Sequence, residues 1–366
     1  MKDNSSVNLP IGIALLPIFF LVLLLSINVF IYGDDSLNGT NQFILILSGL
    51  FGASLGFIYN VSYKEILKKI SNSVKSVTGA LLILLFVGAL AGTWMISGII
   101  PAMVYYGLKI LDPNIFLPAC VVICSIISVA TGSSWTTSAT VGIALVGIGK
   151  ALGIPPGMVG GAVIAGAYFG DKLSPLSDTT NLAAAVTKVD LFRHIKYLTY
   201  TTIPSISITL IVFIILGFMQ VSDGSTDNTY LLSAITEKFN ITLILFSVPI
   251  LVLIMIIKKT PPLIALVIGT LVGAVFAIIF QPQIISELSS GSYSKLTSTY
   301  VVIMDTITGP ISIETNNVIL NDLFSTGGML GMMNTIFLVI GTMVFGGVME
   351  AIGALKTISK TLLQWA

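Results

Sequence analysis

The chain has 366 residues, long enough for two or three soluble domains of ~150 residues each. Its composition excludes that organisation, because charged residues make up only 9% of the chain against roughly 25% in an ordinary globular domain. Apolar residues make up 55%, and 17 basic and 16 acidic side chains cannot cover the surface of a soluble protein of this size. The sequence therefore predicts an all-α polytopic membrane protein.

The net charge and the few cysteine and histidine residues argue against several further classes of protein. The formal net charge is +1, and Arg193 is the only arginine, so nothing favours a nucleic-acid partner. Cys120 and Cys124 lie four residues apart in a charge-free run and supply neither a disulfide framework nor a metal set. A single histidine, His194, excludes a multi-histidine metal site. We therefore expect neither a cofactor nor a resident metal.

Hydropathy divides the chain into about ten apolar segments. The clear spans are Leu9–Tyr32, Asn41–Tyr59, Thr78–Leu108, Ile115–Ala130, Tyr197–Phe218, Ile241–Ile257, Pro262–Phe280 and Thr335–Ala354. A Gly-, Ser- and Thr-rich region between Gly132 and Lys188 adds two interrupted segments, Thr140–Leu152 and Pro156–Gly170. Residues 281–331 are mixed in character and predict a long external loop or a partly embedded excursion.

Lysines indicate the orientation in the membrane. The loop Asn60–Val77 carries four of them, whereas the preceding loop Gly33–Thr40 has two Asp and no Lys. Because cytoplasmic loops are enriched in Lys and Arg, the later clusters also belong in the cytoplasm. These clusters are Lys188/Arg193/Lys196, Lys258/Lys259 and Lys356/Lys360. This distribution predicts a cytoplasmic N-terminus.

A short internal similarity predicts an inverted repeat. Gly92–Ala102 lines up with Gly341–Ala351, and the lysine argument makes the two copies run in opposite directions. Inverted repeats with broken helices are typical of secondary transporters, although chance similarity between two Gly-rich helices is the alternative. The repeats would be 1–235, with the ion-binding region 131–187, and an incomplete 236–366. The counterpart of Gly132–Asn181 would fall beyond Ala366, so the second half has degenerated or, as we expect, the chain is truncated.

The segment Gly166–Asn181 carries the chemistry that a transporter needs. It holds Asp171 and Asp178 with Lys172 between them, next to apolar helix, where one carboxylate costs ~2.5–3.5 kcal/mol. Neutral oxygen ligands surround the two acids: Ser174, Ser177, Thr179, Thr180 and Asn181. Such ligands suit a small hard cation, and a carboxylate that binds either a cation or a proton makes the two compete. The alternative is an external turn whose Asp and Ser residues cap helices.

A second polar cluster, Thr131–Thr140, predicts another wall of the same cavity. Its candidate lining residues are Ser133, Ser134, Thr136, Thr137 and Ser138, with Lys172 from the first cluster. The alternative is that these hydroxyls bond to carbonyls one turn earlier in their own helix. Glu350 is a candidate proton site or an interfacial charge, and His194 a candidate pH sensor or a plain juxtamembrane residue.

The motif Gly166-Ala-Tyr-Phe-Gly-Asp-Lys-Leu-Ser-Pro-Leu-Ser-Asp-Thr-Thr-Asn-Leu-Ala183 resembles the NhaC-type sodium/proton antiporter family. The resemblance extends over Gly132–Val189 and Phe192–Pro204, and back to Gly92–Trp94 and Pro101–Leu108. It implies a bacterial inner-membrane carrier that exchanges Na+ for H+ and serves pH homeostasis, with Na+ held at Asp171 and Asp178. Carried over by position, Asp171, Ser174, Asp178, Thr180 and Asn181 would line the cation path, facing Ser133–Thr140. The resemblance also implies a second set of broken helices after the region that matches Thr335–Ala354, and we expect this chain to lack it.

Other functions stay open beside this hypothesis. The same family includes malate/lactate antiporters, so a Na+- and H+-coupled carboxylate antiporter is the first alternative, and an inactive truncated fragment is another. An intramembrane hydrolase is disfavoured, because Asp171 and Asp178 lie in one irregular segment rather than on two facing helices. We therefore expect a carrier and not an enzyme. Its expected partners are Na+, H+ and membrane lipids, with a homodimer as the candidate assembly.

Overall fold

A computed structural model describes residues 9–110, 112–175, 177, 179–180, 183–184, 189–219, 228–258, 260–289, 294–315, 320–321 and 324–365. Regular structure in these residues is almost entirely helical, which confirms the predicted all-α class. One short antiparallel pair joins β1 (Ile311–Ser312) to β2 (Ser325–Thr326). The chain forms two compact units, Met1–Leu85 with Met332–Ala366 and Phe86–Gly331. The division into repeats at residue 235 stays a prediction.

Seven helices of the described chain are long and apolar enough to cross a membrane. They are α1 (Ile11–Tyr32), α2 (Thr40–Ile58), α3 (Tyr63–Ile96), α5 (Pro113–Thr131), α10 (Leu191–Met219), α13 (Pro262–Phe280) and α18 (Met333–Ala351). A further apolar helix pair, Leu231–Lys238 and Leu243–Ile256, is bent by 87° and forms either a broken span or a re-entrant loop. The chain is therefore a multi-pass membrane protein.

The predicted span Thr78–Leu108 is wrong in two respects: its helix begins earlier than predicted, and it is broken into two helices. Helix α3 already begins at Tyr63 and ends at Ile96, and a new helix, α4 (Ile99–Ile110), follows a break at Gly98, whose φ is +78°. Most of the predicted loop Asn60–Val77 is therefore helix. Its Lys, Glu and Leu residues are good helix formers, so α3 continues beyond the apolar stretch that hydropathy detects.

The predicted span Ile241–Ile257 begins later than expected. Helix α12 covers Ser247–Ile257 and follows α11 (Asn228–Lys238) and a short 3-10 turn. The buried side chain of Gln281 holds this bend, because its Nε2 donates to the Asn240 carbonyl and its Oε1 accepts from the Asn240 N–H, both at 3.0 Å. Residues 281–331, predicted as a loop or an embedded excursion, contain α14 (Pro282–Leu288), α15 (Lys295–Thr308), the β1–β2 pair and α17 (Gly328–Gly331).

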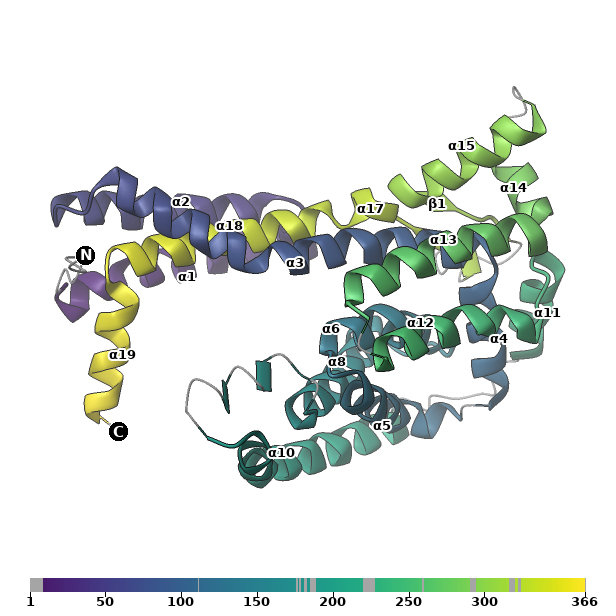
Figure 1. The fold of residues 1–366 in the computed structure, drawn as a ribbon, viewed down its shortest axis with the longest axis horizontal. Helices are drawn as coiled ribbons and strands as arrows, with labels where there is room; N and C mark the ends of the chain where they lie inside the picture. Colours follow the sequence, from purple (N-terminus) through teal and green to yellow (C-terminus); the bar gives the residue numbers. More distant parts are fainter. Residues whose placement is uncertain are drawn as a thin grey trace. The chain divides into compact units, whose positions relative to one another are not determined.

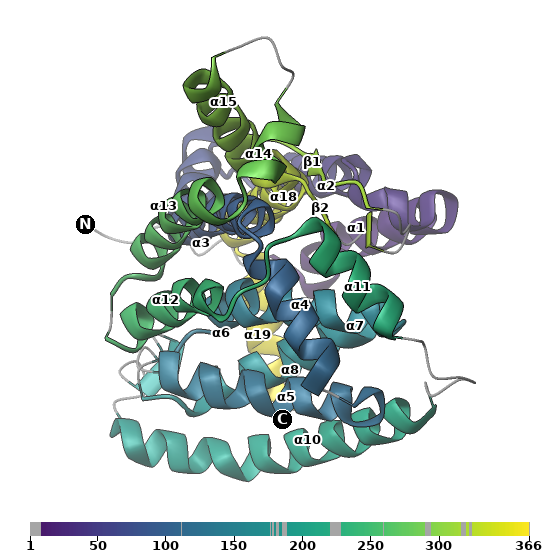
Figure 2. The same ribbon diagram turned by 90° about the vertical axis from the view of Figure 1, so that its right-hand side faces the viewer.

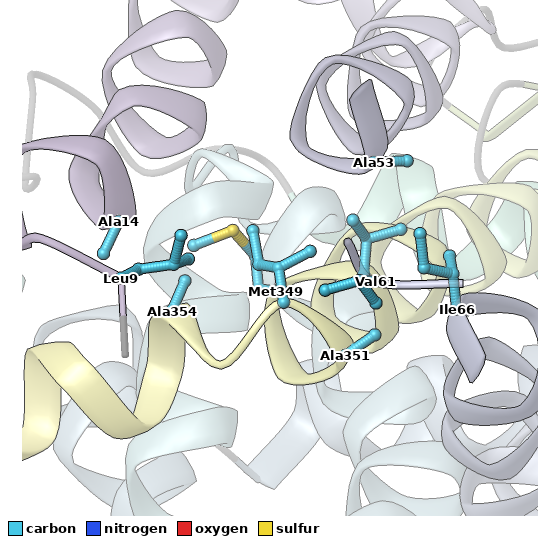
Figure 3. Close-up of a cluster of buried hydrophobic side chains, with 10 residues drawn as sticks. Leu9, Ala14, Ala53, Val61, Ile66, Met349, Ala351 and Ala354 are labelled. Atoms are coloured by element: carbon cyan, nitrogen blue, oxygen red, sulfur yellow. The ribbon is translucent and has the colours of Figure 1, made fainter. Parts of the chain in front are cut away.

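The first unit is built from α1, α2, α3 as far as Leu85, α18 and α19 (Ala354–Trp365). Helix α2 packs along both α1 and α18 (Figure 1). Apolar side chains from several of these elements meet in one core cluster, with Met349 at its centre between Ala354 and Val61 (Figure 3). The amide of Asn28 ties α1 to α2 by donating to Asn41 Oδ1 at 2.8 Å.

Glu350, a candidate proton site in the sequence, lies at the end of α18 in this unit. Its Oε1 accepts from Lys69 Nζ of α3 at 2.8 Å, and the two side chains are 50% and 34% exposed. An exposed ion pair of this kind stabilises a fold by at most about 1 kcal/mol. The pairing favours the interpretation of Glu350 as an interfacial charge.

The second unit is organised around the close packing of α5 against α8 (Pro156–Leu173). A β-carbon added at Gly166 would overlap the carbonyl oxygen of Val121, and one at Gly170 would overlap that of Ser125. These glycines therefore let two helix backbones touch, as membrane helices require for close association. Helix α10 lies alongside both (Figure 2). The packing fixes the C-terminal end of α8, which carries Asp171.

Substitution at this contact tests the packing. We expect Gly166→Ala to lower the stability of the folded chain by about 1–3 kcal/mol, because the methyl group overpacks against the α5 backbone. The matched control is Gly157→Ala in the same helix, where nothing lies within 4 Å of the added carbon and where alanine favours helix. Thermal unfolding of the purified protein in detergent measures both. Equal melting temperatures for the two variants would contradict the packing role.

Candidate functional site

The first wall of the site comes from the turn after α5. Asp112 caps the start of α5, and Gly132 ends the helix in the left-handed conformation with φ +68°. After Ser133 the chain forms α6 (Ser134–Thr137), one π-helical turn (Ser138–Gly142) and α7 (Ile143–Ala151). The segment predicted as Thr140–Leu152 thus begins six residues earlier. Single π-turns inside helices are frequent at functional sites, and here the turn directly follows the hydroxyl-rich α6.

The second wall is the C-terminal end of α8. Helix α8 stops at Leu173, two residues after Asp171. Two buried hydroxyls bond to main-chain carbonyls here: Ser174 donates to Val129 at 2.8 Å, and Thr180 donates to Lys172 at 3.2 Å. The last carbonyls of a helix lack hydrogen-bond donors within the helix, and the Thr180 hydroxyl supplies a donor to one of these carbonyls. The first bond holds Ser174 against the end of α5, and the second holds Thr180 against the end of α8.

One hydrogen bond joins the two walls. Ser134 Oγ donates to Asp171 Oδ2 at 3.0 Å, and the Asp171 side chain is half-buried. The two polar clusters, 37 residues apart along the chain, therefore lie side by side. A carboxylate that accepts a hydroxyl hydrogen keeps its remaining lone pairs for a cation or for a proton.

Between the walls lies a cavity of about 610 Å³. Its lining residues are Thr131, Gly132, Ser133, Ser134, Trp135, Asp171, Pro175, Ser177, Thr179, Ile256, Thr260, Pro261 and Pro262. Asp171 is the acidic residue among them, and most of the other polar side chains in this set carry a hydroxyl group. Volumes of this size are typical of small-molecule sites in proteins.

Sequence reasoning missed the third wall, which is the corner between α12 and α13. Ile256 and Thr260–Pro262 lie there, far along the chain from the polar clusters. Isoleucine and proline carry no chemical signal for a site. The one hint in the sequence is the interruption of two apolar spans by Lys258 and the following Thr260-Pro261-Pro262.

The remaining predicted residues fall into three groups. Ser133, Ser134, Ser177 and Thr179 line the cavity with Asp171. Thr137, Ser174 and Thr180 are buried and bond to backbone carbonyls, whereas Ser138 and the exposed Lys172 are absent from the described lining. Asp178 and Asn181, and the side chain of Thr136, lie outside the described residues.

The donor set suits a hard cation or a small polar molecule. One carboxylate and several hydroxyls are oxygen ligands of the kind that alkali and alkaline-earth ions take. In the described part of the chain, His, Cys, Asp and Glu nowhere gather in a group of three or more that could hold a metal ion. The same hydroxyls can also donate hydrogen bonds to an anion, so the geometry alone defines a polar, oxygen-lined cavity in a multi-pass membrane protein.

Comparison with known proteins places the chain in a family. A profile of the Na+/H+ antiporter family matches residues 166–366. The chain is 39% identical over 344 residues to the malate-2H+/Na+-lactate antiporter of Bacillus subtilis, covering 93% of this chain and 69% of that protein. It is 35% identical over 320 residues to the Na+/H+ antiporter NhaC of Alkalihalophilus pseudofirmus, covering 87% and 66% respectively.

A third relative is named for a different exchange reaction. The arginine/ornithine antiporter ArcD of Halobacterium salinarum is 33% identical over 353 residues, covering 95% of this chain and 69% of that protein. No solved structure shows significant similarity to the chain. The chain belongs to the Na+/H+ antiporter family. The resemblance carried by the Gly166–Ala183 motif is therefore confirmed.

Cysteine labelling tests the position of the cavity. We expect Ser133→Cys to react at least about tenfold faster with a charged, water-soluble maleimide than Ser128→Cys, because exposure to water governs thiol reactivity. Ser128 is fully buried in α5 and donates to the Ala167 carbonyl at 2.6 Å. The native Cys120 and Cys124 are also fully buried and should stay unlabelled. Equal labelling of both variants in detergent would show that the cavity is closed or misplaced.

Proposed function

We propose that the chain acts as a secondary transporter that exchanges Na+ for H+ across the bacterial cell membrane by alternating access. The observation that carries this proposal is the Asp171 carboxylate, which lines an oxygen-rich cavity and bonds to Ser134 across two walls. Family membership supports it, because the matched profile describes Na+/H+ antiporters. In this proposal Na+ and H+ are cargo, and the protein needs neither a prosthetic group nor an enzymatic step.

Competition at Asp171 couples the two cargoes. When the carboxylate is ionised, its negative charge attracts Na+, and hydroxyl oxygens of Ser134, Ser177 and Thr179 complete the coordination in place of water. When a proton binds the carboxyl group instead, the charge that stabilises Na+ disappears. Because one site then holds either cargo but not both, movement of Na+ in one direction requires movement of H+ in the other. Asp178, from the family motif, is proposed as the second carboxylate.

The lysine distribution supports a cytoplasmic N-terminus and a cytoplasmic corner between α12 and α13. Lys258 ends α12, and the cavity is lined by the residues that follow it, Thr260–Pro262. Under the positive-inside rule this corner lies in the cytoplasm. We therefore propose that the cavity opens towards the cytoplasm in this conformation.

A coupled carboxylate exchange is the second candidate function. A cavity of about 610 Å³ is much larger than one Na+ requires, and its hydroxyls could donate hydrogen bonds to a small hydroxycarboxylate. The relative at 39% identity carries the name of a malate/lactate antiporter. Uptake of labelled lactate and malate into proteoliposomes, with and without a Na+ gradient, separates the two: stimulated uptake favours the carboxylate reaction.

Removal of the charge at Asp171 tests the exchange itself. We expect Asp171→Asn to abolish proton movement after a Na+ pulse in everted vesicles, because an amide neither ionises nor takes up a proton near neutral pH. Asp305→Asn is the matched control, since Asp305 is an exposed aspartate on α15 in the same unit. Amounts of inserted protein are compared by immunoblot. Normal exchange by Asp171→Asn would remove Asp171 from the mechanism.

The bond from Ser134 gives a finer test. We expect Ser134→Ala to raise the Na+ concentration for half-maximal exchange by about fivefold to tenfold, since one ligand oxygen and one hydrogen bond to a charged group are lost. The maximal rate should change much less, because the carboxylate remains. Initial rates over a range of Na+ concentrations give both quantities. An unchanged half-maximal concentration would mean that Ser134 does not touch the ion.

A further inference from the structure

A second cavity, unrelated to the proposed exchange site, lies where α13, α14 and α15 meet. Its volume is about 440 Å³. One wall is apolar and consists of Ile278, Pro282 and Ile285, and the other carries hydroxyl groups together with Lys295. The hydroxyl-bearing residues are Ser286, Ser289, Ser298 and Thr299. The described lining of the cavity is therefore apolar on one side and polar on the other, where Lys295 lies.

The charge of this cavity is positive. Lys295 is exposed, and no carboxylate of the described chain lies within ion-pair distance of it. The nearest acidic residue along α14, Glu287, is already paired, because its Oε2 lies 2.7 Å from Lys238 Nζ. Among the described residues Ser286 Oγ also has no hydrogen-bond partner. The Lys295 ammonium and the Ser286 hydroxyl can therefore both donate hydrogen bonds to an anion.

Exposed apolar side chains also lie at the end of α13 and on the side of α15 that does not line the cavity. Leu296, Tyr300 and Met304 recur every four residues on one side of α15 and are 85%, 65% and 40% exposed. At the end of α13, Ile278 and Ile279 are 45% and 61% exposed. Helix α13 has 19 residues, about the length that crosses the hydrocarbon core, so we expect its end at the boundary between acyl chains and headgroups.

We propose that this cavity binds an anionic phospholipid. The phosphate lies against Lys295 and the hydroxyl of Ser286, while the acyl chains run along the apolar wall formed by Ile278, Pro282 and Ile285. Lysine at a membrane surface attracts anionic lipid, and a cavity with both a polar and an apolar wall can hold the two parts of such a molecule. The lipid would anchor the α14–α15 hairpin at the bilayer surface.

Native mass spectrometry of the full 366-residue chain tests the proposal. The protein is released from nanodiscs that contain equal amounts of phosphatidylglycerol and phosphatidylcholine, and the lipids that stay bound are identified by mass. We expect one phosphatidylglycerol to be retained by the unaltered chain. Lys295→Gln should lower the retained fraction about fivefold, and Lys295→Arg should keep it. Lys64→Gln removes an exposed lysine of α3 and serves as the matched control.

Soluble anions distinguish a lipid site from a simple phosphate site. Glycerol 3-phosphate and inorganic phosphate carry the polar part of the ligand without acyl chains, so neither should displace the retained lipid at millimolar concentration. Displacement by either would overturn the assignment to a lipid. Equal loss of lipid in Lys295→Gln and Lys64→Gln would show only a general attraction of lysines for the membrane, and it would also overturn the proposal. Sodium-driven exchange is measured on the same variants, and its loss is not required.

Discussion

A carboxylate in a membrane protein with so few charges must be solvated by something other than lipid. Asp171 lies at the end of a helix whose preceding residues are apolar, and an ionised acid in such surroundings costs several kcal/mol unless it finds partners. The fold supplies them by turning three segments towards one point. The end of α5 with α6, the end of α8 and the corner between α12 and α13 surround the acid with hydroxyls and leave room beside it.

Other contacts in the second unit hold these three segments in place around Asp171. Glycines at 166 and 170 bring the α8 backbone onto α5, and Ser174 and Thr180 then hold the segment beyond α8 by bonds to main-chain carbonyls. Ser134 closes the gap between the two ends with a single bond to the acid. Irregular backbone is tolerated in a membrane only where it is buried in protein or lines a cavity. Of the described residues beyond α8, Ser174 and Thr180 are buried, and Pro175, Ser177 and Thr179 line the cavity.

Hydropathy and motif reading predicted the helical membrane class, most of the spans and the pairing of the two polar clusters. Each rests on information that is local in the chain, such as an apolar run or a carboxylate among hydroxyls. The break at Gly98 and the bend held by Gln281 could not be predicted in this way, because both depend on contacts with distant residues. The α12–α13 corner escaped for the same reason, since Ile256 and Pro261 belong to the site only through their position in space.

A proton count on Na+ binding tests most directly whether the two cargoes compete for Asp171. The purified 366-residue chain is titrated with NaCl in weakly buffered detergent solution while released protons are measured with a pH indicator. We predict proton release that approaches one per Na+ bound as the pH falls into the range where the carboxyl group is protonated, together with weaker apparent Na+ binding. Sodium binding whose strength is independent of pH and that releases no protons would contradict a shared site.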